Sequence, residues 1–113
     1  MKQTAAVFIS LVSIFLFVTF ACSGGSSNKA EKESKGEEMF KFNCTVCHPN
    51  GENVINKEKT LHKADLDKNG IKTPDDIVKL MRNPGPGMRK FDEKTISDHD
   101  AHEIAEYVLK AFK

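Results

Sequence analysis

The chain has 113 residues, with 17 basic and 16 acidic side chains, a mean hydropathy of −0.43 and three cysteines. This length provides for one small domain and excludes a multidomain protein. The near balance of charge argues against nucleic-acid binding, because such proteins need a strongly basic face.

Residues 1–21 have the pattern of an export signal peptide. Lys2 gives a positive start, and residues 5–20 are almost wholly apolar. An uncleaved membrane helix is the alternative, because a run of this length is at the short limit of what spans a bilayer. We expect cleavage, because small residues and Cys22 follow directly.

Cys22 follows the apolar run at once, and an odd number of cysteines normally indicates a leftover thiol. Residues 18–22 resemble the cleavage box of bacterial lipoproteins, in which the cysteine becomes the lipidated N-terminus, although Thr19 and Phe20 depart from the usual residues. The alternative is ordinary cleavage before Cys22, which leaves a free thiol. Residues 22–35 lack an apolar face and have the composition of a flexible tether. We therefore predict a lipid anchor at Cys22 and a tether over 22–35.

Residues 36–113 are predicted to form the folded domain. A core of this size is marginal without a disulfide, a metal or a large cofactor. The domain contains only Cys44 and Cys47, which lie too close in sequence for a long-range disulfide. We therefore expect a cofactor to stabilise it.

The first helix is expected over residues 36–47. Apolar residues and the two cysteines recur there at a three-four spacing, which sets Cys44 and Cys47 on the side of Phe40. The polar residues 50–56 are expected to form a loop.

Three further helices follow in the sequence pattern. A short one is expected over residues 60–68, closed by the Asn-Gly pair that comes next. Thr73 has the features of an N-cap, with proline and two acidic residues after it, and the Pro/Gly segment 83–87 ends that helix. The last helix opens at Ser97, with an acidic residue three positions on, and has the clearest amphipathic pattern. No segment has a strand period, so we predict an all-α fold.

Residues 44–48 read Cys-Thr-Val-Cys-His, the attachment signal of c-type haem. This spacing lets Cys44 and Cys47 form thioethers with two vinyl groups, while His48 reaches the iron from the same turn. A thioredoxin-like dithiol is one alternative, but it expects a strand-helix-strand context. A zinc site is another, but it needs four ligands and the chain has no second cysteine pair. We predict one covalently bound haem c, with His48 as an iron ligand.

The sixth iron position of a low-spin electron carrier needs a second strong ligand, usually Met or His. Met88 follows the segment 84–87, where two prolines stiffen the loop and two glycines let the backbone pass close to a flat macrocycle. Met39 and Met81 fall on apolar helix faces and are expected in the core. We predict Met88 as the ligand. The rival ligands are His99 and His102, and we expect them, like His62, to face solvent.

Methionine ligation favours ferrous iron and raises the reduction potential relative to two imidazoles. Two strong ligands leave no open position for peroxide or small gases, so we expect outer-sphere transfer of single electrons and no enzymatic activity. One alternative is a haem sensor or small oxidase-like enzyme in which Met88 dissociates. Another is a haem-bearing structural subunit of a larger reductase.

Residues 36–113, with these motifs in place, resemble the class I cytochromes c. In that family the first and last helices cross, and four residues match the crossing: Gly36, Phe40, Ile104 and Tyr107. The resemblance implies a small all-α fold of four to five short helices wrapped around one haem.

Residues 51–70 are similar to the cytochrome c-six group of algae and cyanobacteria. Residues 82–88 are similar to the outer-membrane monohaem lipoproteins of metal-reducing bacteria, which share that fold. More weakly, the resemblance implies that Asn53 and Lys59-Thr60 pack along the haem near its propionates. It also implies one set of haem-binding residues: Cys44, Cys47, His48 and Met88.

The chain departs from that group after Met88, where Arg89-Lys90 replaces Pro-Ala. Together with Arg82 and Lys94, these residues are candidates for a basic surface near the loop, while the last helix is acidic. We expect an ordinary solvated surface; the alternative is a dipole that steers an acidic partner to the haem edge.

The expected address of the chain follows from its signal peptide and its relatives. We expect an exported monomer held in the bacterial cell envelope, either at the outer membrane through Cys22 or in the periplasm. Its expected partners are redox proteins of a respiratory chain, with no nucleic acid among them.

Overall fold

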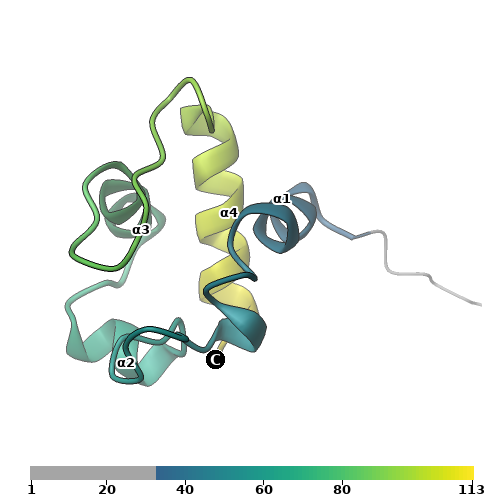
Figure 1. Ribbon diagram of the computed structural model, residues 1–113. Helices are drawn as coiled ribbons and strands as arrows, with labels where there is room; N and C mark the ends of the chain where they lie inside the picture. The colour runs from purple at the N-terminus through teal and green to yellow at the C-terminus, as the bar shows by residue number, and fades with distance from the viewer. Residues whose placement is uncertain (1–32) are drawn as a thin grey trace, which may run out of the picture.

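Helices are the only regular elements in residues 33–113, the part of the chain that the computed structural model describes (Figure 1). They follow in the order α1 (Lys35–Asn43), η1 (Pro49–Gly51, a 3-10 turn), α2 (Lys63–Lys68), α3 (Pro74–Arg82) and α4 (Asp98–Ala111). This confirms the all-α fold of four to five short helices. The predicted signal peptide 1–21 and Cys22 lie outside the described residues. Residues 33–113 contain no helix that is both long and apolar enough to cross a membrane.

The first helix differs from its prediction at both ends. It begins at Lys35 rather than at residue 36, because the Ser34 hydroxyl caps it by accepting a hydrogen bond from the Glu37 N–H at 3.2 Å. It ends at Asn43, with Cys44 as the C-cap, so the prediction of a helix through residue 47 is wrong.

The second helix is also shorter than predicted and begins at Lys63 rather than at residue 60. The Thr60 hydroxyl donates to the Asp65 carboxylate and accepts from the His62 N–H at 3.2 Å. These bonds hold residues 60–62 in a non-helical conformation before α2 begins. Asn69 ends the helix as predicted, and Gly70 follows with a φ of +74°, a left-handed conformation that glycine adopts without strain.

The longest helix, α4, lies between the other two long ones (Figure 1). Gly36 of α1 is buried at the crossing with α4, where a Cβ atom would overlap the carbonyl oxygen of Glu103. The ring of Phe40 packs there with its centroid 5.4 Å from those of Tyr107 and Phe112. The absence of a side chain at Gly36 therefore sets how closely the first and last helices approach, as the family resemblance implies.

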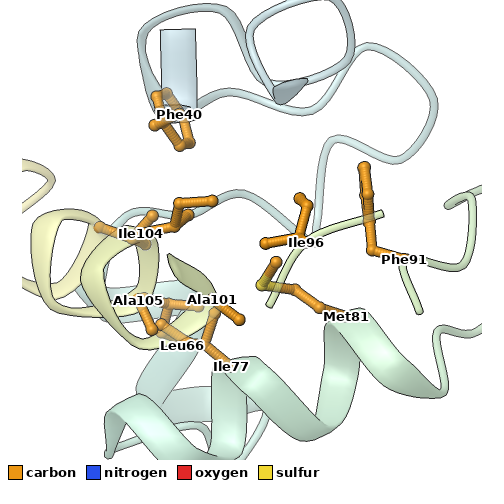
Figure 2. Close-up of a cluster of buried hydrophobic side chains, with 10 residues drawn as sticks. Phe40, Leu66, Ile77, Met81, Phe91, Ile96, Ala101, Ile104 and Ala105 are labelled. Carbon is orange, nitrogen blue, oxygen red and sulfur yellow. The ribbon is translucent and has the colours of Figure 1, made fainter. Parts of the chain in front are cut away.

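A single apolar cluster joins α1, α2, α3 and α4 with the segment before α4. Figure 2 shows side chains of α3 pointing towards those of α4. Met81 is 3% exposed within the cluster and Met39 packs against it, which confirms both as core residues. The buried members are Phe40, Leu66, Ile77, Met81, Phe91, Ile96, Ala101, Ile104, Ala105 and Val108.

The two capping signals of the later helices behave differently. Thr73 caps α3 as predicted, and a reciprocal bond with Asp76 completes a capping box. Ser97 caps α4 by accepting from the Asp100 N–H at 3.2 Å, but the carboxylate of Asp100 pairs with Lys35. The Asp100 side chain therefore does not return to the N-cap; it joins α4 to α1 through Lys35.

Thr73→Ala is expected to lower the free energy of unfolding by about 1 kcal/mol, the usual cost of losing a hydroxyl N-cap. The Thr73 hydroxyl also donates to Asp76 at 2.8 Å, and this bond is the main reason that the pKa of Asp76 lies below its ordinary value. The stability from this carboxylate is present above its unfolded pKa and is lost as pH falls through its lowered folded pKa. Urea titrations should therefore show the difference between wild type and variant shrinking below about pH 4. A difference that stays constant to pH 2 contradicts this assignment.

Candidate functional site

The turn that follows α1 carries three of the predicted site residues. The carbonyl of Cys44 accepts hydrogen bonds from the Cys47 N–H at 3.1 Å and from the His48 N–H at 2.8 Å. These two bonds fold residues 44–48 into one tight turn. The cysteines therefore come together through the turn, and the prediction that both lie on the face of one helix is wrong.

A cavity of about 290 Å³ opens beside this turn. Its walls come from the end of α1, from α3 and α4, and from the loops around Asn53 and Met88. Apolar side chains of the core, including Leu66, Ile77 and Met81, form much of its surface. All four predicted haem-binding residues line it: Cys44, Cys47, His48 and Met88. Two thiols, an imidazole and a thioether on one apolar cavity form the donor set that haem c requires.

His48 is 9% exposed, and its ring is oriented by the backbone. Nδ1 lies 2.9 Å from the carbonyl oxygen of Glu52, so it is the nitrogen that carries the proton. This leaves Nε2 as the lone-pair donor for iron, in the arrangement usual for metal-binding histidines. Burial lowers the pKa of His48, which favours the neutral imidazole that a metal needs.

The environment of Cys44 argues against the dithiol alternative. The pKa of the Cys44 thiol is raised to about 11, mainly by burial and secondly by the neighbouring Cys47. Cys44 also caps the C-terminal, negative end of α1, where a thiolate is disfavoured. Redox-active Cys-x-x-Cys pairs have the opposite property, a lowered thiol pKa.

No group of three or more histidine, cysteine or acidic side chains within residues 33–113 is arranged to hold a metal ion. A structural zinc site needs four such ligands. The zinc alternative therefore has no support in this part of the chain.

Met88 reaches the cavity on the loop between α3 and α4. Its side chain is half-buried, and Gly87 beside it has a φ of +94°. A Cβ atom on Gly87 would lie 3.1 Å from Cγ2 of Ile55, so the loop passes close to the opposite rim of the cavity. Glycine is required here for both the backbone angle and the close approach.

The other histidines do not line the cavity. His99 is exposed as expected. His62 and His102 are partly covered, with Nε2 atoms 3.3 Å from Oε1 of Glu52 and 3.2 Å from Oδ1 of Asp75. These side chains remain 40% and 45% exposed, so both are surface histidines with an acidic neighbour, and neither lines the cavity.

Asn53 organises the loop that forms one rim. Its side-chain oxygen accepts hydrogen bonds from the N–H groups of Ile55 and Asn56, and its Nδ2 donates to the Lys59 carbonyl at 2.8 Å. Asn53, Lys59 and Thr60 all line the cavity. This is the stretch that the resemblance assigns to the haem propionates.

Arg82 does not belong to the exposed basic surface that the sequence suggests. Its side chain is only 19% exposed, and Nη2 lies 2.6 Å from Oδ1 of Asp98. Arg89, Lys90 and Lys94 are exposed, and the Arg89 guanidinium lies 4.8 Å from the centre of the Phe91 ring. The sequence does not indicate the roles of Arg82 and Glu52. Glu52 acts through its own backbone carbonyl, and Arg82 binds the Phe91 carbonyl and Asp98, which is sixteen residues away.

Comparisons with known proteins agree with this site. The family described as "Cytochrome C oxidase, cbb3-type, subunit III" matches residues 31–108. Cytochrome c6 of Synechocystis sp. strain PCC 6803 is 34% identical over 109 residues, covering 96% of this chain and 90% of that protein.

Solved structures give the same result. The outer membrane cytochrome OmcF of Geobacter sulfurreducens is 46% identical with a TM-score of 0.67, over 69% of this chain and 99% of that one. Cytochrome c6 of the diatom Phaeodactylum tricornutum is 37% identical with a TM-score of 0.62, over 67% of this chain and 88% of that one. The chain therefore belongs to the class I c-type cytochromes of the cytochrome c6 type, small electron carriers with one covalently bound haem c.

Proposed function

We propose that this chain carries single electrons in a bacterial cell-envelope respiratory chain. Cys44 and Cys47 would hold the haem through thioethers, and His48 and Met88 would be the ligands of its iron. The observation that carries this proposal is that all four side chains line one cavity, although Met88 lies forty residues after the attachment turn. The haem supplies reversible one-electron chemistry.

The residues around the cavity bind and orient the cofactor. Glu52 holds the His48 ring through its carbonyl, and the apolar side chains of the wall exclude water. A dry environment disfavours the extra positive charge of oxidised iron, as does a thioether ligand. The chain would therefore favour the reduced form, and because His48 and Met88 would both bind the iron, we propose that it is not an enzyme.

Electron exchange needs a partner close to the haem edge, and the rim offers an apolar contact there. Ile55 lines the cavity yet remains 61% exposed, and Val46, between the two cysteines, is 82% exposed. Exposed apolar side chains grouped at a site are typical of protein contact surfaces. We propose that redox proteins of the cell envelope dock on this rim while the chain itself is a monomer.

The proposed cellular location depends on Cys22. The similarity to an outer membrane cytochrome supports an envelope location, and the apolar run before Cys22 supports export. We propose that residues 1–21 are removed, that Cys22 receives the lipid, and that the following residues tether the domain to a membrane.

The experiment for this proposal compares wild type with Cys22→Ala by cell fractionation and radiolabelled palmitate. The wild type is expected in the membrane fraction with label. We expect the variant in the soluble envelope fraction, unlabelled, with an unchanged haem spectrum. Ser23→Ala is the matched control and should behave as wild type. Wild-type protein that is soluble and unlabelled would contradict the anchor, and a chain without haem absorption would contradict the function.

A further inference from the structure

Arg82, the last residue of α3, has an enclosed guanidinium. Nη1 donates to the Phe91 carbonyl at 3.0 Å, and Nη2 donates to the Asp98 carboxylate at 2.6 Å. Nε is buried and meets no hydrogen-bond partner within residues 33–113. A buried donor without a partner is costly, and arginine on a surface normally keeps its head group in water. The two hydrogen bonds of Nη1 and Nη2 therefore hold the guanidinium in place despite the free-energy cost of the unpaired Nε.

The bond to Phe91 closes the loop that carries Met88. The Phe91 N–H donates to the Met81 carbonyl at 2.9 Å, so the last turn of α3 engages both backbone polar groups of Phe91. The Phe91 ring is 3% exposed in the core. Within the loop, the Met88 N–H reaches the Gly85 carbonyl only at 3.4 Å. The position of Met88 thus depends more on this closure than on hydrogen bonds inside the loop.

The bond to Asp98 extends the closure to α4. Asp98 is the first residue of that helix, where a negative charge is favourable, and Arg82 is in the last turn of α3, where a positive charge is favourable. One guanidinium consequently joins α3, the loop and α4. Lysine cannot replace it, because an ammonium is a point charge without a planar fork for two fixed acceptors.

We propose that Arg82 is a positioning residue that keeps the Met88 sulfur at the iron. The proposal rests on the proposed ligation by Met88. A thioether favours ferrous iron, so the oxidised protein depends most on a loop that holds its ligand in place. Loosening the closure gives the loop more conformational freedom, and an added ligand then competes with Met88 more easily.

Imidazole binding to the oxidised, haem-loaded protein tests this role. Arg82→Gln is expected to bind imidazole about tenfold more tightly than wild type, because the loss of charge-assisted hydrogen bonds frees the loop. Arg82→Lys keeps the charge but loses the fork, and should resemble Arg82→Gln. Asp98→Asn keeps the Phe91 bond and should lie between Arg82→Gln and wild type.

Two controls separate positioning from general stability. Thr73→Ala destabilises the other end of α3, and Lys79→Gln removes an exposed charge from the same helix; neither should change imidazole affinity. In a Met88→Ala background, Arg82→Gln should have no effect on imidazole affinity. Unchanged affinity in Arg82→Gln, with the iron–sulfur charge-transfer band present in the wild type, overturns the positioning role alone. A wild type without that band overturns ligation by Met88 and this inference with it.

Discussion

Met88→Ala is expected to produce a protein that binds carbon monoxide readily when reduced and has lost the iron–sulfur charge-transfer band when oxidised. Met88 is the one methionine that reaches the cavity from a Pro/Gly loop, and removing its sulfur opens the sixth position. Because a thioether stabilises ferrous iron, the reduction potential should also fall, by on the order of 0.1 V. Absorption spectroscopy and potentiometric titration measure the three effects.

Met39→Ala is the matched control, since Met39 packs against the core and does not line the cavity. It should lose packing energy while keeping the band and the potential. A Met88→Ala variant that retains the band contradicts the ligand assignment. Wild-type protein that binds carbon monoxide as readily as the variant would favour the sensor alternative.

Gly36→Ala is expected to lower the free energy of unfolding by about 3 kcal/mol, at the upper end of the cost of overpacking. The new Cβ atom would overlap the Glu103 carbonyl and lie 3.1 Å from Cβ of Tyr107. Both contacts are with the rigid part of α4, so the helices must separate. Denaturant titration of the haem-loaded protein measures the change.

Glu38→Ala, on an exposed position of the same helix, is the control and should change stability by less than about 0.5 kcal/mol. Because both substitutions introduce alanine, helix propensity alone would stabilise α1 in both variants. An equal loss in both would therefore contradict a cost that is specific to the crossing. Stability unchanged in Gly36→Ala would mean that α1 and α4 are less closely packed than the structure has them.

Helix boundaries set by local chemistry could be predicted from the sequence. The start of α3 depends on Thr73 and the proline and acidic residues after it, and the structure has Thr73 as the predicted N-cap. The end of α1 could not be predicted in this way. Its period continues through Cys47, but the helical hydrogen bonds end with the Cys44 N–H, and the Thr45 hydroxyl donates to the Lys41 carbonyl at 2.6 Å.

The site residues likewise fall into those that local sequence indicates and those that only the folded structure shows. The Cys-x-x-Cys-His motif is contiguous, and Met88 is indicated by its loop, so the sequence alone suggests all four haem-binding residues. Glu52 and Arg82 act through a carbonyl and through bonds to Phe91 and Asp98, and these contacts exist only once the chain has folded. Residue type and spacing carry no record of such contacts.

The central claim is a haem held by thioethers at Cys44 and Cys47, and mass spectrometry of the denatured chain tests it most directly. Protein expressed with a haem-attachment system should carry the mass of one haem after denaturation in acid, on the peptide that contains residues 44–48. The Cys44→Ala, Cys47→Ala double variant should carry none. A wild-type chain with the mass of the bare polypeptide and two thiols free to react with maleimide would contradict the claim.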